Sequence, residues 1–242
     1  MKSVSKTNIG LVRTGNEDAV LTDAPDLFAI ADGMGGYAAG EVASIETIKV
    51  LREEKKNFAG LTGEALCLAL KAAAARANSH LRSIVCQTPD YEGMGTTLVA
   101  VYLAADGKAY ALNIGDSRLY LWRSGELKQI TQDHSYVAQL LSNGDITTEE
   151  ARRHPQRNVI LRAVGADESL ESDVFCFDIN EGDRLLLCSD GLSDMVTDGE
   201  IAAVLTETDT EKTADALIEL ALNNGGRDNV SVILLDFCAE EI

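Results

Sequence analysis

Proline is scarce in this sequence of 242 residues: there are three, and no stretch rich in proline or serine has the composition of a linker. The chain also lacks internal repeats and low-complexity segments. This length is within the range of one β-sandwich or layered α/β domain. We therefore expect a single domain over residues 1–242.

Basic residues are also few. Lys and Arg number 21 against 39 Asp and Glu, which gives a net charge of −18. Because phosphate backbones attract basic surfaces, nucleic acid and anionic membrane are disfavoured partners. No apolar stretch approaches the length of a membrane span, and the first residues, MKSVSKTNIG, lack the hydrophobic core of a signal peptide. We expect no membrane insertion.

The five cysteines form no C-x-x-C pair, and none is followed six positions later by arginine. The second absence excludes the nucleophile loop of cysteine phosphatases. An odd number of cysteines without a signal peptide is typical of buried thiols in a reducing cytosol. The sequence therefore predicts a cytoplasmic protein.

Four acidic motifs, by contrast, stand at the ends of apolar runs. They are LFAIADG (Asp32), ALNIGDSR (Asp116), RLLLCSDG (Asp190) and GGRDNVSVILL (Asp228). Such runs are typical of buried strands, and in an antiparallel sheet the end of one strand lies beside the start of its neighbour. We expect the four carboxylates to meet at one sheet edge. Clustered like charges need neutralising cations, and hard oxygen ligands favour Mg²⁺, Mn²⁺ or Ca²⁺.

The order of predicted elements indicates sheets in the middle with helix pairs outside. Strands are expected at 20–30 (broken by a turn at 24–26), 96–104, 108–114, 118–122, 126–130, 174–179, 184–188 and 230–237. Helices are expected at 37–54, 62–85, 198–205 and 210–222. A polar insert at about 133–164 carries only short helix signals.

Two further motifs are ambiguous on their own. GLVRTGNED places Arg13 a few residues before Glu17 and Asp18, and arginine binds phosphate bidentately. A surface ion pair is the simpler interpretation of that stretch in isolation. DGMGG, at 32–36, lets the backbone approach a metal or phosphate closely, but D-G is also common in ordinary turns. Only the combination of these motifs with the GDSR, SDG and GGRDN strings argues for a functional site.

Together these residues closely resemble the PPM family, the metal-dependent, PP2C-like protein Ser/Thr phosphatases, and bacterial members in particular. The matching strings are GLVRTGNED, FAIADGMGGYAAGEVAS, GMGTTL, ALNIGDSRLYLW, HPQRNVILRAVG, LLLCSDGLSDMV and GGRDNVSVIL. They occur in the family's order and span almost the whole chain. The resemblance implies an α+β fold: a four-layer α-β-β-α sandwich with two central antiparallel sheets.

The resemblance also implies metal ligands. Asp32 matches the carboxylate that bridges two ions, Mn²⁺ or Mg²⁺, and the Gly33 carbonyl contributes to one of them. Asp190 and Asp228 match ligands of the other ion. Asp116 matches a residue that bacterial members use, with the aspartate at 190, for a third and weaker ion.

The same resemblance assigns the catalytic groups. Glu17 and Asp18 match residues that hold metal-bound waters, with Asp18 close to the nucleophilic water, and Arg13 matches the phosphate-binding arginine. A water bridging the two ions would attack phosphorus directly, without a phosphoenzyme. Animal members commonly have histidine at the position of Met34 as general acid. Methionine cannot donate a proton, so the identity of the proton donor stays open.

The expected substrates are phosphorylated proteins, including a Ser/Thr kinase or its substrates, and we expect a monomer. A dedicated regulator that acts on one phosphoserine partner is a variant of this hypothesis. The alternative is a pseudophosphatase, or a metal-binding regulatory module that keeps the fold without turnover. The presence of every expected ligand and of Arg13 argues against it.

Two features are left open. The insert at 133–164 resembles the mobile flap of bacterial members, and its basic residues, Arg152 and Arg153 among them, either contact phosphorylated substrates or form solvated ion pairs. The three histidines are not expected to be catalytic: His80 is predicted to be exposed, and His134 and His154 lie in the insert.

Overall fold

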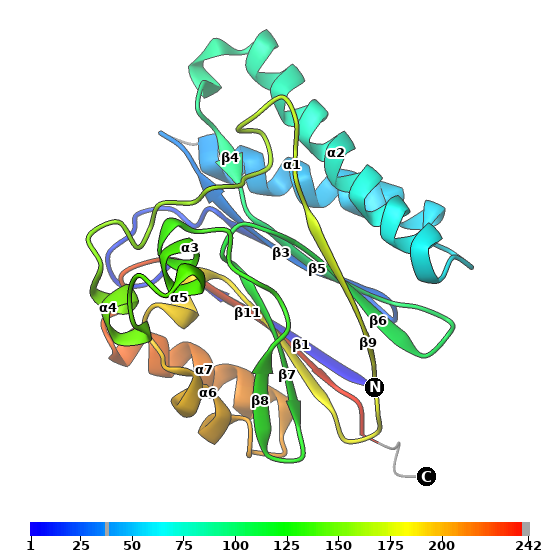
Figure 1. Cartoon of the computed structure of the whole chain (residues 1–242), viewed down its shortest axis with the longest axis vertical. Coiled ribbons are helices and arrows are strands. Elements are labelled where there is room, and N and C mark those ends of the chain that lie inside the picture. The colour runs from blue at the N-terminus through cyan, green and yellow to red at the C-terminus, as the bar shows by residue number, and fades with distance from the viewer. Residues whose placement is uncertain (37–38, 239–242) are drawn as a thin grey trace.

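The computed structural model describes residues 1–36 and 39–238, and it contains two stacked antiparallel sheets (Figure 1). The first sheet has the order β1-β11-β10-β7-β8, formed by Lys2–Asn8, Val230–Asp236, Arg184–Cys188, Arg118–Arg123 and Glu126–Gln129. The second has the order β2-β3-β5-β6-β9, formed by Asp18–Asp23, Leu27–Met34, Leu98–Leu103, Lys108–Ile114 and Asp173–Asp178. The short strand β4 (Gly95–Thr96) pairs with the end of β3.

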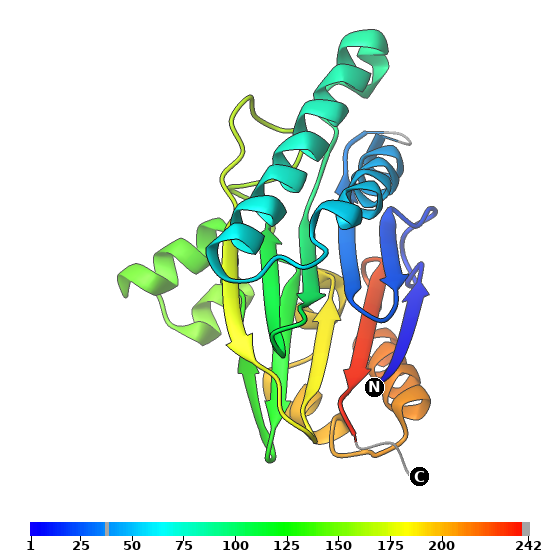
Figure 2. The same cartoon turned by 90° about the vertical axis from the view of Figure 1, so that its right-hand side faces the viewer.

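Helices cover the outer face of each sheet (Figures 1 and 2). The second sheet is covered by α1 (Ala39–Glu54) and α2 (Gly63–Gln87), and the first by α6 (Asp198–Val204) and α7 (Thr210–Asn223). Three short helices lie at one end of the sandwich: α3 (Tyr136–Asn143), α4 (Thr148–Arg153) and α5 (Asp190–Ser193). In the described ranges, no helix combines the length and apolar character that crossing a bilayer requires.

Alternating side chains along each strand build three apolar layers between these four layers of backbone. In β3, Phe28 and Ile30 face the other sheet, whereas Leu27, Ala29 and Ala31 face α1 and α2. All five are fully buried, and burying a side chain as large as Phe or Ile contributes about 2 kcal/mol. The expected four-layer α-β-β-α sandwich is confirmed.

Most predicted elements are confirmed, with small changes at their ends. The turn predicted at 24–26 separates β2 from β3, and Ser124 and Gly125 form the turn before β8 with φ angles of 52° and 86°. This left-handed pair suits the two-residue hairpin that joins β7 and β8. The helix expected from 37 begins at Ala39, and residues 37 and 38 lie outside the described residues. Strand β1 and helix α5 were not predicted.

One expectation about the fold was wrong: the four acidic motifs do not meet at an edge of one sheet. β6 and β7 are consecutive in sequence but belong to different sheets, so the link at 115–117 crosses between them and carries Asp116. Asp32 lies two residues before the end of β3 in the second sheet, whereas Asp190 follows β10 and Asp228 precedes β11 of the first. The acidic residues therefore gather at one end of the sandwich, with contributions from both sheets.

Candidate metal centre

Asp18 and Asp32 are direct neighbours across the β2–β3 ladder. The Asp18 carboxylate also reaches the other sheet, because its Oδ2 accepts hydrogen bonds from Ser189 Oγ at 2.9 Å and Ser231 Oγ at 2.6 Å. Ser231 Oγ lies 2.8 Å from Thr7 Oγ1 on β1. Two sheets and four strands thus fix the position of this carboxylate.

Two threonines hold the backbone of Asp32: Thr96, the last residue of β4, and Thr97, which follows it. Thr96 Oγ1 donates to the Asp32 carbonyl at 2.8 Å, and the Asp32 N–H donates to Thr97 Oγ1 at 3.0 Å. Thr97 Oγ1 also lies 2.7 Å from Ser117 Oγ, in the link that carries Asp116. The end of β3 and the crossing link are therefore held together by side-chain hydroxyls.

Gly33 sits where backbone segments approach too closely for any side chain. A Cβ atom on this residue would lie 2.1 Å from the Gly40 carbonyl oxygen and 2.7 Å from that of Glu17. The Gly33 N–H donates to the Glu17 carbonyl at 3.1 Å. The close packing brings the start of α1 and the Glu17 side chain to the end of β3, and burial raises the pKa of the Glu17 carboxyl.

Arg13 lies at the mouth of the site, where its Nη2 donates to Asp228 Oδ2 at 2.7 Å. The arginine side chain is half exposed, at 50%. Asn229 holds the loop behind it: Oδ1 accepts from the Glu17 N–H at 2.8 Å, and Nδ2 donates to the carbonyls of Ile9 and Gly15, both at 2.9 Å. Asn229 therefore shapes the loop that presents Arg13.

The buried carboxyl groups of the site all have raised pKa values. Burial and neighbouring carboxylates raise the pKa of Asp32 and of Asp190 well above the usual range. Burial raises the pKa of Asp18 to about 6, and burial with Asp133 and Asp194 nearby raises that of Asp116 to about 7. Like charges in a buried site disfavour one another's ionisation, and a cation would relieve them.

The donor set fits divalent cations. One oxygen each of Asp18, Asp116 and Asp190 is buried without a hydrogen-bond partner. Over residues 1–36 and 39–238, no three acidic, His or Cys side chains converge into a ready-made metal shell. A metal shell at this site would also need backbone oxygens and water, which suits Mg²⁺ and similar ions that keep several waters.

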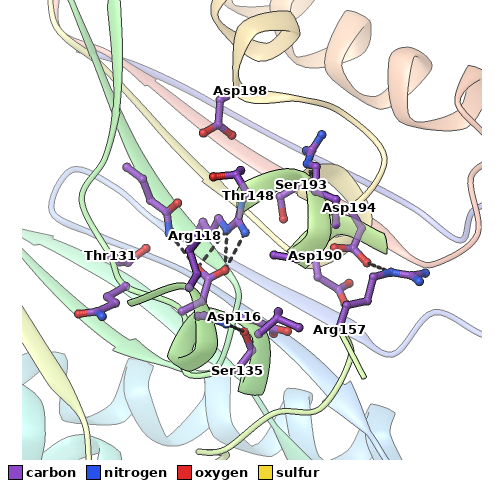
Figure 3. A pocket seen from close by; sticks show the side chains of 18 of the residues that line it. Asp116, Arg118, Thr131, Ser135, Thr148, Arg157, Asp190, Ser193, Asp194 and Asp198 are labelled. Carbon is purple, nitrogen blue, oxygen red and sulfur yellow. Dashed lines mark hydrogen bonds and ion pairs between the residues drawn. The ribbon is translucent and has the colours of Figure 1, made fainter. Parts of the chain in front are cut away.

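A cavity of about 690 Å³ adjoins Asp116 and Asp190, between the insert and α5 (Figure 3). Arg118 is held in its wall by Asp133, with Nη2 donating to Oδ2 at 2.7 Å. Arg157 Nε approaches Asp194 Oδ2 at 3.4 Å. The insert thus forms one wall of a space that opens onto the carboxylate cluster.

The family model for protein phosphatase 2C matches residues 13–225 of this chain. The chain belongs to the protein phosphatase 2C family. It is 46% identical over 236 residues to the serine/threonine protein phosphatase PstP of Mycobacterium tuberculosis, covering 98% of this chain but 45% of PstP. It is 38% identical over 242 residues to the serine/threonine phosphatase stp of Listeria innocua, covering 98% of this chain and 96% of stp.

A solved structure of the PstP catalytic domain in complex with two manganese ions superimposes on this chain with a TM-score of 0.89. The sequences are 43% identical, and the match covers 98% of each chain. This chain spans about half the length of full PstP. The fold and the family are therefore shared along nearly the entire chain.

In this phosphatase-family member the histidines have structural partners. His134 is buried: Nδ1 accepts from the Gly115 N–H at 3.2 Å, and Nε2 lies 2.9 Å from Asp173 Oδ2. His80 has 41% of its side chain accessible, and its Nε2 lies 2.9 Å from Glu46 Oε2.

The two arginines of the insert differ in their surroundings. Arg152 Nη2 donates to the carbonyls of Ser193 and Val196, both at 3.1 Å, which ties the insert to α5. Arg153 is 81% exposed and pairs with Glu149 at 2.7 Å. Arg152 therefore ties the insert to the rest of the protein, and Arg153 forms a solvated ion pair.

Sequence reasoning missed three side chains of the centre. Ser189 and Ser231 are not distinguished from other strand hydroxyls until the two sheets are stacked. Asp194 had a detectable signal, because it follows Asp190 by four residues and so lies one helical turn away. It is among the charges that raise the pKa of both Asp116 and Asp190.

Proposed function

We propose that this chain is a metal-dependent protein phosphatase that hydrolyses phosphoserine and phosphothreonine in proteins. The observation that carries the proposal is the set of buried, unpartnered oxygens of Asp18, Asp116 and Asp190 beside the half-exposed guanidinium of Arg13. Such a site offers oxygen ligands to cations and a bidentate donor to a phosphoryl group. Family membership, and the names of the Mycobacterium and Listeria relatives, support the same activity.

The bound ions would be two Mn²⁺ or Mg²⁺, and the manganese complex of the PstP catalytic domain favours this choice. Asp32, the Gly33 carbonyl, Asp190 and Asp228 would hold them. Asp116 and Asp190 would hold a third, weaker ion. When bound, such ions act as Lewis acids and make a coordinated water more acidic.

The remaining chemistry belongs to the protein. Arg13 would bind two non-bridging phosphoryl oxygens and neutralise the charge that develops on them. Glu17 would orient water through its carboxylate. Asp18, held by Ser189 and Ser231 through Oδ2, would keep Oδ1 free to orient the attacking water and accept its proton. Met34 supplies no proton, so the leaving oxygen would take one from water or from another side chain.

The substrates would be phosphorylated proteins, including a Ser/Thr kinase or the proteins it modifies. We propose one domain over residues 1–242, acting as a monomer in the cytoplasm. All five cysteines are free thiols, which supports a reducing environment. The expectation that they are buried holds for Cys188 and was wrong for the exposed Cys86, Cys176 and Cys238.

The test is phosphate release from a phosphothreonine peptide with Mn²⁺, with Mg²⁺ and with excess EDTA. The proposal predicts release that requires the ion, survives a thiol-blocking reagent and is abolished by Asp190→Asn. A folded wild-type protein that releases no phosphate with either ion would instead be a pseudophosphatase or a metal-binding regulatory module with the same fold.

A further inference from the structure

Two strongly exposed aliphatic side chains directly precede Arg13. Leu11 is 67% exposed and Val12 is 65% exposed, and among the large apolar residues that the structure describes, Leu68 on α2 comes nearest at 61%. Leu68 lies on a helix surface, whereas Leu11 and Val12 directly precede Arg13 in a loop that is held against Gly226. Scattered apolar residues on a surface are ordinary, but an adjacent pair beside a binding group points to contact with a ligand.

The backbone under this pair is held firmly. The Leu11 N–H donates to the Gly226 carbonyl at 2.7 Å, two residues before the Asp228 that pairs with Arg13. Gly226 has φ +47°, and a Cβ atom there would lie 2.9 Å from Leu11 Cγ. The loop at 9–15 is also tied at both ends by Asn229. Leu11 and Val12 are therefore presented in a defined position.

We propose that Leu11 and Val12 form an apolar lip that contacts the residue next to the phosphoserine or phosphothreonine of a protein substrate. The proposal rests on the proposed function, because it places the phosphoryl group on Arg13. Leu11 and Val12 are the two residues before Arg13, so a phosphoryl group on Arg13 places the substrate chain next to the loop segment that carries the lip.

The chemistry of the flanking residue follows from that of the lip. The neighbouring groups of the mouth are charged, through Arg13 and Asp228, whereas Leu11 and Val12 offer hydrocarbon alone. An apolar side chain beside the phosphoresidue gains by covering them, and a charged side chain would lose hydration there. The lip selects peptides with leucine, isoleucine or valine at a position flanking the phosphoresidue.

The experiment compares two phosphothreonine peptides that differ only at the flanking positions, leucine in one and serine in the other, together with a small aryl phosphate. The wild type should prefer the leucine peptide in kcat/KM by roughly tenfold, the low end of the range for an apolar contact in a pocket, because the lip is exposed. In the double variant L11S/V12S this ratio should fall toward one, mainly through a higher KM for the leucine peptide. The control variant L68S removes an equally exposed leucine on α2 and should keep the wild-type ratio.

Three outcomes would overturn the lip. The first is a wild-type ratio near one with both peptides hydrolysed. The second is an unchanged ratio in L11S/V12S. If this variant instead abolishes a dimer that the wild type forms in sedimentation, the pair contacts a second copy of this chain and not the substrate. The third is an equal loss on the peptides and the aryl phosphate, which would show a damaged centre. Absence of hydrolysis of any substrate by the wild type would instead contradict the proposed function, so the two failures are distinguishable.

Discussion

Ser231 donates a 2.6 Å hydrogen bond to Asp18 although the two residues belong to different sheets. Together with Ser189 at 2.9 Å, it occupies one carboxylate oxygen and leaves the other free toward the centre. The alignment of the two sheets at this end of the sandwich therefore determines where the free oxygen of Asp18 lies. This relationship gives a first prediction about catalysis.

Ser231→Ala should lower kcat on a phosphothreonine peptide by about tenfold, with a smaller change in KM, because supporting hydrogen bonds at metal sites typically change activity or metal affinity by 10–100-fold. The variant Ser79→Ala is a control, since that hydroxyl bonds only to the Ala75 carbonyl of its own helix. A Ser231→Ala enzyme with the wild-type kcat would show that Asp18 does not need this support.

Removing divalent ions should make stability depend on pH in a definite direction. The folded-state pKa values of Asp18 and Asp116 are raised from 3.8 to about 6 and about 7. The folded protein then binds more protons than the unfolded chain, so this contribution to stability is complete below pH 3.8 and is lost as pH rises through 7. In EDTA, the melting temperature should fall by on the order of 5 °C between pH 5 and pH 7.5.

Two comparisons check that prediction by thermal unfolding. Added Mn²⁺ should flatten the pH dependence by neutralising the carboxylates, and Asp116→Asn should make the EDTA-treated protein more stable at pH 7.5. An EDTA-treated wild type that is equally stable at both pH values would contradict the electrostatic account of the cluster.

Arg13 should matter for phosphate and not for metal. Arg13→Ala should reduce kcat/KM roughly 100-fold, the scale for losing a donor to transition-state charge, and Arg13→Lys should recover only part of it because lysine cannot bind two oxygens in a fork. Since Arg13 pairs with Asp228 at 2.7 Å, its removal should leave Mn²⁺ affinity equal or tighter. A weaker Mn²⁺ affinity in calorimetry would place Arg13 in the metal site instead.

The two arginines of the insert should behave differently on charge reversal. Arg152→Glu breaks two bonds to carbonyls next to α5, and we expect it to lower kcat about tenfold on peptide and aryl phosphate alike. Arg153→Glu, at an 81% exposed position, should stay within about twofold of wild type on both substrates. A loss in Arg153→Glu that is confined to phosphopeptides would show that the insert contacts substrate.

The far end of the sandwich gives a prediction about stability alone. Arg184 is 7% exposed and binds Asp236 through its guanidinium, with Nη2 donating to Oδ2 at 2.9 Å and Nη1 to the Leu205 carbonyl at 2.7 Å. Arg184→Met leaves Asp236 buried without its partner, which costs about 3–5 kcal/mol, or on the order of 10 °C in melting temperature.

The matched control is Lys108→Met, at the corresponding first position of another strand, where the pair with Asp178 is exposed. It should cost under about 1 kcal/mol. Equal effects of the two variants would contradict the distinction between the buried and the exposed ion pair.

The sequence predicted the elements that are buried on both faces. Residues 185–188 of β10 and 232–235 of β11 are continuous apolar runs because each strand packs against the other sheet on one side and helices on the other. Strand β1 was missed because it is an edge strand whose residues, KSVSKTN, are mostly polar and partly exposed. Its pairing with β11 comes from a segment more than two hundred residues away.

The acidic residues of the centre were predicted from their motifs, but their arrangement was not. Periodicity places Asp32 and Asp190 at strand ends without showing that the strands belong to different sheets. That information lies in the β6–β7 link, which crosses between the sheets with Asp116. The contacts of Asp18 with Ser189 and Ser231 depend on this stacking, so local pattern could not indicate them.

The most direct measurement is a titration of Mn²⁺ into metal-free protein. Calorimetry records the binding, and phosphate release from a phosphothreonine peptide is measured in parallel at each Mn²⁺ concentration. The carboxylate cluster should bind two ions per chain, and hydrolysis should rise as the two ions bind. The variant Asp190→Asn should lose both the binding of the two ions and the hydrolysis. Tight binding of two ions without any hydrolysis, or hydrolysis that persists in excess EDTA, would contradict a centre in which these carboxylates hold the ions that drive phosphoester cleavage.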